Sequence, residues 1–310
     1  MRRQRGLSLV ELMVAVAIGT LVTLLAVTLL ISAQTSYVAH TEAARVDDAG
    51  RFALSVLERA ARQTGLADWD EAQVANANAN ATGALPIMGL DAASLSSDSA
   101  GINNPRPAAI NGSDVLALRF AGVGSAEGDG SATTCAGFSV GRGQEGWSIF
   151  YVGASAKGEP ELRCKYRGNN SWSAEAVVGG VDSFQVLYGL DTDTAPDGQA
   201  NRYLNASAIN ALDAALALDG SSEDERMRQY LGKTHWKRVT SVKVALVLHG
   251  AQRSKIVGAP AAWHLFGEAY SNAAVGDTGV RIDQAKLTPA LRERERRVFS
   301  STILLRNPLH

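Results

Sequence analysis

The sequence predicts an α+β protein in which one long N-terminal helix packs against an antiparallel β-sheet. Three observations support this fold class: a long uncharged run near the N-terminus, an amphipathic segment that continues it, and several strand-like runs bounded by glycine in the remainder of the chain. A helix and strands segregated along the chain in this way are typical of α+β proteins.

The first element is the uncharged run at residues 12–31, "LMVAVAIGTLVTLLAVTLLI". As a helix it would extend about 30 Å, which matches the hydrocarbon core of a bilayer. Arg2, Arg3 and Arg5 precede the run, so we expect the N-terminus in the cytoplasm and the rest of the chain across the membrane. The run is longer than the apolar region of a secretory signal, and no small-residue cleavage site follows it. Cleavage after the run is therefore not expected.

The second element continues the helix over residues 32–66. Its apolar residues recur at spacings of about three and four, and charged residues lie between them. The apolar residues are Phe52, Val56, Leu57, Ala60 and Ala61. This pattern predicts an amphipathic stripe that docks on a sheet. Gly65 is the expected C-terminal stop, and Gly50 is a possible flexible point.

Residues 67–310 are expected to form a β-rich globular domain. The strand-like runs lie at 114–122, 147–153, 161–168, 179–191, 238–250 and 297–307. They predict one antiparallel sheet of at least five strands against the distal half of the helix. Residues 67–113 are expected to be surface loop or partly ordered structure, and 191–237 to contain one or two short surface helices.

Glu11 is the one acidic residue near the apolar run, and its carboxylate would cost roughly 2.5 kcal/mol or more in hydrocarbon. The stretch that contains it, "RGLSLVELMVAVAIG", resembles the class III signal of type IV pilins and type II secretion pseudopilins. The resemblance implies that prepilin peptidase removes leader 1–6 between Gly6 and Leu7 and methylates the new Leu7 amine. Residues 7–31 would then be the transmembrane and assembly helix.

The resemblance also suggests a purpose for the carboxylate. In a bundle of such helices, Glu11 of one subunit can lie near the new amine of a neighbour, and pairing offsets much of the cost of burying a charge. One alternative is that Glu11 snorkels to the membrane interface. Another is that the segment is an uncleaved signal anchor.

The later blocks resemble the PilW family of large minor pilins. They are "VLYGLDTD", Trp236 followed by "RVTSVKVALVLHG", and "RRVFSSTILLRNP". The resemblance implies a non-enzymatic subunit of the inner membrane with a periplasmic domain. It would join other minor pilins and the major pilin at the assembly platform, in the initiating or tip complex, and later reach the pilus. The alternatives are a J-type minor pseudopilin of a type II secretion system and a signal-anchored periplasmic enzyme or binding module.

The cysteines Cys135 and Cys164 are expected to form a disulfide, since the domain is expected outside the cytoplasm. Two buried free thiols are the alternative. A zinc site is not expected, because the chain lacks CxxC and clustered His/Cys spacings.

Asp191, Asp193 and Asp197 offer oxygen ligands at alternating positions, which suit calcium. An EF-hand is excluded, because Pro196 and Arg202 stand where that loop requires Gly and Glu. The alternative is a turn held by Asp side chains without an ion.

Other function classes are disfavoured by composition and motif. The net charge of −1 without a basic patch argues against nucleic-acid binding. The glycine-dense stretch 122–130 lacks the Lys and Ser/Thr of a P-loop, and the chain has no GxSxG elbow. The tryptophans are expected in the core or at partner contacts rather than as a sugar platform.

Overall fold

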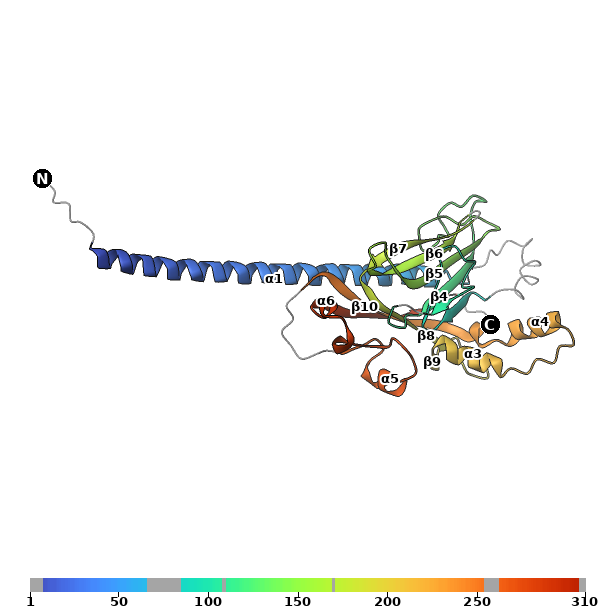
Figure 1. Ribbon diagram of the computed structural model, residues 1–310. Coiled ribbons are helices and arrows are strands. Elements are labelled where there is room, and N and C mark those ends of the chain that lie inside the picture. The colour runs from blue at the N-terminus through green and yellow to red at the C-terminus, as the bar shows by residue number, and fades with distance from the viewer. Residues whose placement is uncertain (1–7, 66–84, 108–109, 169–170, 254–261, 307–310) are drawn as a thin grey trace.

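The long helix predicted at the N-terminus is α1 (Leu9–Gln63), which projects far beyond the globular part of the protein (Figure 1). The computed structural model describes residues 8–65, 85–107, 110–168, 171–253 and 262–306. The α+β prediction is confirmed. Helix α1 ends where expected, since Thr64 is its C-cap and Gly65 adopts φ 70°, the left-handed conformation in which glycine commonly terminates helices.

The predicted strands exist, but they belong to two main sheets rather than one. The five-stranded antiparallel sheet has the order β1-β4-β5-β6-β7, made of β1 (Ile87–Leu90), β4 (Val115–Ala121), β5 (Glu145–Ala154), β6 (Pro160–Arg167) and β7 (Trp172–Gly179). The four-stranded antiparallel sheet has the order β13-β10-β8-β9, made of β8 (Val181–Leu190), β9 (Arg202–Leu204), β10 (Val239–Arg253) and β13 (Arg294–Leu304).

The expectation of a single sheet was therefore wrong, and the break lies at Gly180. This residue has φ 75°, and a Cβ built on it would lie 2.6 Å from the carbonyl oxygen of His249. The chain turns there from the edge strand β7 of one sheet into the centre of the other. Local strand patterns do not carry this information, because pairing partners are chosen at long range.

In the described part of the chain, the shorter elements are two strand pairs and six short helices around the two main sheets. The small strand pairs are β2 (Ala93–Ser94) with β3 (Arg106–Pro107) and β11 (Ala262–His264) with β12 (Arg281–Asp283). The short helices are α3 (Ala206–Ala214), α4 (Glu223–Lys233), η1 (His235–Arg238), α5 (Glu268–Ala273), η2 (Gln284–Lys286) and α6 (Pro289–Arg292). Helices α3 and α4 lie in the segment where short helices were expected, whereas β1 to β3 lie in a segment for which no strand was predicted.

One core joins α1 to the inner faces of both main sheets. Its fully buried members include Leu57 of α1, Phe150 of β5, Phe184 of β8 and Leu246 of β10. A second cluster packs on the outer face of the five-stranded sheet, and a third packs β11 and β12 against the outer face of the four-stranded sheet. Each main sheet is therefore covered on both faces.

The buried stripe of α1 contains three of the five predicted residues, Leu57, Ala60 and Ala61, and continues toward the N-terminus through positions that were not predicted. The structure buries Val46, Gly50, Ala53 and Leu57, while Phe52 is 54% exposed. The buried positions are mostly small, because the helix approaches the strands closely. Hydrophobicity alone favoured the larger Phe52, which lies about 100° around the helix from Ala53.

Candidate functional site

The N-terminal end of α1 is held by a reciprocal cap between Ser8 and Glu11. The Ser8 backbone N–H donates to Glu11 Oε2 at 2.9 Å, and the Glu11 N–H donates to Ser8 Oγ at 3.3 Å. This capping box satisfies two free N–H groups of the first turn and places the carboxylate at the positive end of the helix dipole. Gly6 and Leu7 lie outside the described residues.

The membrane-length half of α1 projects from the globular domain (Figure 1). Residues 8–37 are all exposed, and the helix is long and apolar enough to cross a membrane. Its threonines do not leave free hydroxyls: Thr20, Thr23 and Thr28 donate to carbonyl oxygens of the preceding turn at 2.8–2.9 Å. Internal hydrogen bonds of this kind let polar side chains lie in hydrocarbon.

The docked half of α1 begins at a buried carboxylate, Glu42. Its Oε2 accepts the backbone N–H of Gln252 at 3.1 Å, and its Oε1 accepts Arg45 Nη1 at 3.0 Å. The Glu42 side chain is only 2% exposed, and a Cβ on Gly250 would lie 3.0 Å from Oε2. Glu42 thus fastens the helix to the end of β10, where it enters the domain.

Two further contacts fasten α1 to β13. Arg297 Nη1 donates to both carboxylate oxygens of Asp47, at 2.8 and 2.6 Å. Gly50 lies against Phe299, and a Cβ there would come within 2.5 Å of the ring. The structure therefore gives Gly50 a close packing contact on β13, where the sequence suggested a flexible point.

A charged cluster lies beside this junction and connects the two sheets; Asp182, His249 and Arg296 are buried in it, and Glu159 is partly exposed. Arg296 Nε donates to Asp182 Oδ2 at 2.7 Å, and His249 Nδ1 lies 3.0 Å from Asp182 Oδ1. Arg294 donates both terminal nitrogens to Glu159, at 2.9 and 3.0 Å, in the bidentate geometry that guanidinium favours. Glu159 belongs to the turn between β5 and β6, so this pair joins the five-stranded sheet to β13.

The charges in this cluster stabilise one another. Burial by itself would raise the pKa of Asp182, but the hydrogen bond and charge of His249 together with Arg296 hold it below its ordinary value. The hydrogen bond from Arg294 is the main cause that lowers the pKa of Glu159. Both carboxylates are therefore held in the ionised form.

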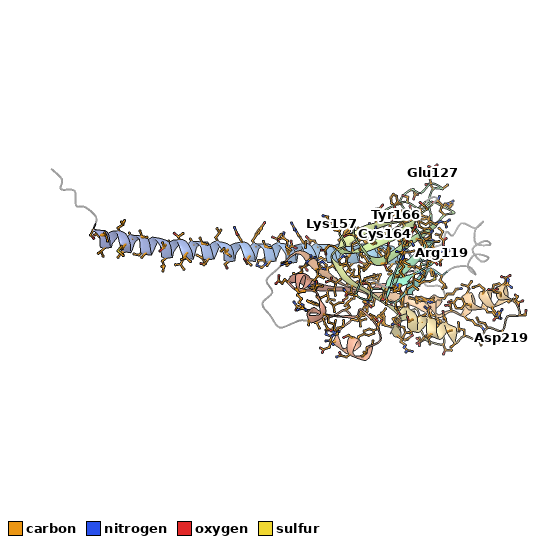
Figure 2. All side chains as sticks on the ribbon, in the orientation of Figure 1. Arg119, Glu127, Lys157, Cys164, Tyr166 and Asp219 are labelled. Atoms are coloured by element: carbon orange, nitrogen blue, oxygen red, sulfur yellow. A yellow bond between two sulfur atoms is a disulfide. The ribbon has the colours of Figure 1, made fainter. Side chains whose placement is uncertain are left out.

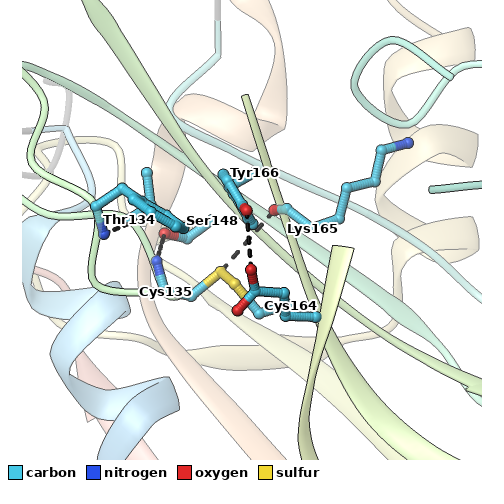
Figure 3. The surroundings of a disulfide bond; sticks show 8 residues. Thr134, Cys135, Ser148, Cys164, Lys165 and Tyr166 are labelled. Atoms are coloured by element: carbon cyan, nitrogen blue, oxygen red, sulfur yellow. Dashed lines mark hydrogen bonds between the residues drawn. A yellow bond between two sulfur atoms is a disulfide. The ribbon is translucent and has the colours of Figure 1, made fainter. Parts of the chain in front are cut away.

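The predicted disulfide between Cys135 and Cys164 is present, with Cα atoms 5.9 Å apart (Figure 3). It attaches the loop before β5 to strand β6, as the loop-and-strand positions of the two cysteines suggested. Around it, the Cys135 N–H donates to Ser148 Oγ at 2.9 Å, and Phe138 stacks on Tyr166 with ring centroids 4.9 Å apart. Figure 2 shows Cys164 and Tyr166 close together on β6 of the five-stranded sheet.

The three aspartates after β8 do converge: one carboxylate oxygen from each of Asp191, Asp193 and Asp197 lies within 4.8 Å of the others. Asp191 is buried, and its two oxygens accept backbone N–H groups of Asp193 at 3.1 Å and Gly198 at 2.8 Å. Burial would raise the pKa of Asp191, but these backbone donors hold it below its ordinary value. Backbone N–H groups of the loop already donate to both carboxylate oxygens of Asp191. The arrangement therefore fits a turn held by Asp side chains without an ion as well as a set of calcium ligands.

Sequence reasoning missed one anchoring residue, Glu42, although the sequence carries a signal for it. Glu42 stands four residues before Val46 and therefore lies on the buried face of α1. A charged residue on that apolar face is the signal. The Asp182–Arg296 pair had no such signal, because its members are 114 residues apart and meet only through strand pairing.

Two family models support the sequence resemblance. The family model described as "Type IV Pilus-assembly protein W" matches residues 149–307, and the one described as "Prokaryotic N-terminal methylation motif" matches residues 1–27. Among solved structures, a type IV-like pilin from Thermus thermophilus matches with TM-score 0.37 and 15% identity, covering 86% of this chain and 100% of that chain. A search of curated proteins found no match.

Proposed function

Because this chain belongs to the PilW family of type IV pilus-assembly proteins, we propose that it is a minor pilin that takes part in assembling a type IV pilus. Its N-terminus would be cytoplasmic and its globular domain periplasmic. Prepilin peptidase would cleave between Gly6 and Leu7 and methylate Leu7. The subunit would then enter the initiating or tip complex with other minor pilins, on the inner-membrane assembly platform.

The observation that carries this proposal is the contrast between the two halves of α1. The distal half is docked on the sheets through Glu42, Asp47 and Gly50, whereas the apolar half is exposed along its whole length. An exposed apolar surface of that length is unfavourable in water, so it requires lipid or the helices of neighbouring subunits. A rigid connection to the domain would let the helix carry the domain into a fibre.

Glu11 supplies the proposed register between subunits. Within the described part of the chain, its carboxylate accepts a hydrogen bond from the Ser8 backbone N–H. An amine of a neighbouring subunit about 4 Å away would add roughly 4 kcal/mol of attraction at an effective dielectric constant near 20. That is comparable with the roughly 2.5–3.5 kcal/mol cost of a carboxylate at the centre of a membrane helix. Pairing would therefore favour the assembled state over the isolated subunit.

The first test is N-terminal mass spectrometry of the native protein from cells with and without prepilin peptidase. We expect N-methyl-Leu7 only when the peptidase is present. An intact leader in both strains would overturn the proposal and return the protein to the class of signal-anchored domains.

The second test separates processing from assembly. Glu11→Ala and Glu11→Gln are expected to retain cleavage at Gly6 and to reduce surface pili, because both remove the charge that the neighbouring amine would pair with. Glu58→Gln, on the exposed face of the docked half, is the matched control and should assemble normally. Normal piliation in both Glu11 variants would contradict the pairing mechanism.

Deletion of the chain distinguishes the pilus from the related secretion machinery. Loss of surface fibres and twitching is expected. Loss of secreted enzymes with intact pili would instead identify a J-type minor pseudopilin of a type II secretion system.

A further inference from the structure

The outer face of the five-stranded sheet carries two arginines and two tryptophans on adjacent strands. Strand pairing sets Arg119 of β4 opposite Trp147 of β5, and Arg167 of β6 opposite Trp172 of β7. We call these four residues the Arg–Trp row; Arg119 is labelled in Figure 2. The two indole rings lie 5.7 Å apart, edge to face, and the Arg119 guanidinium lies 5.4 Å from the Trp147 ring. The row lies on the opposite side of the sheet from α1, in a separate apolar cluster.

A cavity of about 640 Å³ opens over this row. Its walls are Trp147 and Trp172, the loop at Ile102 and Asn103, and Met88 of β1. The volume falls within the roughly 300–1,000 Å³ that is common for small-molecule sites, and the mixture of aromatic walls with a few polar groups is also typical of them. The tryptophans are thus neither fully in the core nor isolated on the surface.

The charge balance of the cavity is positive. Glu145, in its wall, forms an ion pair with Arg119 and lies 3.8 Å from Arg167. The Arg167 side chain is 53% exposed and makes no hydrogen bond within the part of the chain that the structure describes. With two guanidinium groups facing one carboxylate, Arg167 retains donors and charge for a ligand.

The remaining polar groups of the wall are also mostly free donors. Among the described residues, the indole N–H groups of Trp147 and Trp172, the Asn103 amide and the Ser171 hydroxyl have no hydrogen-bond partner. A ligand that satisfies this wall must be rich in acceptors, carry negative charge and present a flat apolar face to an indole ring. A pyranose ring that bears a carboxylate has all three properties, since its C–H face is apolar and its edge carries oxygens.

We propose that the Arg–Trp row is a binding site for an acidic saccharide. A sugar ring stacks on the exposed indole surface of Trp147 or Trp172, and its carboxylate takes a bidentate hydrogen bond from Arg167. Asn103 and Ser171 bond the ring hydroxyls. Nucleic acid fits the site less well, because the cavity has one uncompensated cation and the whole chain has a net charge of −1.

The experiment uses the full chain in detergent and measures calorimetric binding and tryptophan fluorescence. The probe is a tetrasaccharide of alternating glucuronate and N-acetylglucosamine, and the matched probe is the same tetrasaccharide with its carboxylates reduced to alcohols. We expect saturable binding of the acidic probe with a fluorescence change, and at least tenfold weaker binding of the reduced probe.

Two variants and one control locate the site. Arg167→Gln should weaken binding of the acidic probe at least tenfold without changing the weak binding of the reduced probe. Trp172→Phe should weaken both probes several-fold, and Arg202→Gln, an exposed arginine on β9 of the other sheet, should change neither. Arg167→Gln lies on an exposed side chain, so it keeps the test valid if Trp172→Phe fails to fold.

The proposal is overturned if the acidic probe gives no saturable binding at millimolar concentration, or if Arg167→Gln binds it as tightly as the native chain. It is also overturned if an acidic peptide of Asp and Glu binds at the row more tightly than the saccharide, since that would identify a protein partner.

Discussion

The disulfide between Cys135 and Cys164 should contribute a large share of the stability of the globular domain. The two cysteines are 29 positions apart, and closing a loop of that length in the unfolded chain corresponds to about 3.6 kcal/mol at 25 °C in the chain-entropy treatment. For a domain of this size, a loss of that magnitude lowers the melting temperature by roughly 7–14 °C.

The test compares the native chain with the double variant Cys135→Ser, Cys164→Ala. Alanine suits Cys164, which is only 1% exposed, because a hydroxyl would be buried there without need. The full chain in detergent is unfolded by urea with and without a thiol reductant. We expect the reduced native chain and the double variant to unfold at the same urea concentration, well below that of the oxidised native chain.

The reductant has no disulfide to act on in the double variant, so it should leave that midpoint unchanged. If the oxidised native chain and the double variant unfold at the same urea concentration, the loop-closure reasoning is refuted. If the reductant shifts both proteins equally, its effect does not come from this disulfide.

Three further predictions concern Glu42 of α1, Lys165 of the five-stranded sheet and the loop that carries Asp191. Glu42→Ala should lower the free energy of unfolding by about 1–3 kcal/mol, because it removes the buried carboxylate that accepts hydrogen bonds from the Gln252 N–H and from Arg45. Glu42→Gln should cost less than half as much, since the amide oxygen still accepts. Equal losses in urea unfolding would contradict this role. Burial lowers the pKa of Lys165 from 10.5 to about 8, so the folded protein binds fewer protons than the unfolded chain between pH 8 and 10.5. The free energy of unfolding of the native chain should therefore rise with pH across that window relative to Lys165→Met. Parallel pH profiles of the two proteins would disprove this. Since both oxygens of Asp191 already accept backbone N–H groups, the melting temperature in millimolar calcium should equal that in a chelator. A rise of several degrees in calcium that Asp193→Asn abolishes would establish a calcium site instead.

Much of the architecture is visible in local patterns. The uncharged run and the amphipathic segment after it predicted one continuous helix, because a 3.6-residue period depends only on neighbours along the chain. The six strand-like runs became β4, β5, β6, β8, β10 and β13, and the two cysteines formed the expected bridge. The roles of Gly6, Leu7 and Glu11 stay predictions, since they depend on processing and on neighbouring subunits.

The sequence by itself thus determined the α+β class, the helix, the strands and the family signature, all of which are written in short stretches of the chain. Only the tertiary structure decided how the strands divide between two sheets, which residues extend the buried face of α1 beyond the predicted ones, and which charges meet. Asp182 and Arg296 are far apart in sequence, and the Arg–Trp row draws one residue from each of four strands. The physical reason is that strand register and helix phase are set by the packing of whole faces against one another, which no single segment specifies.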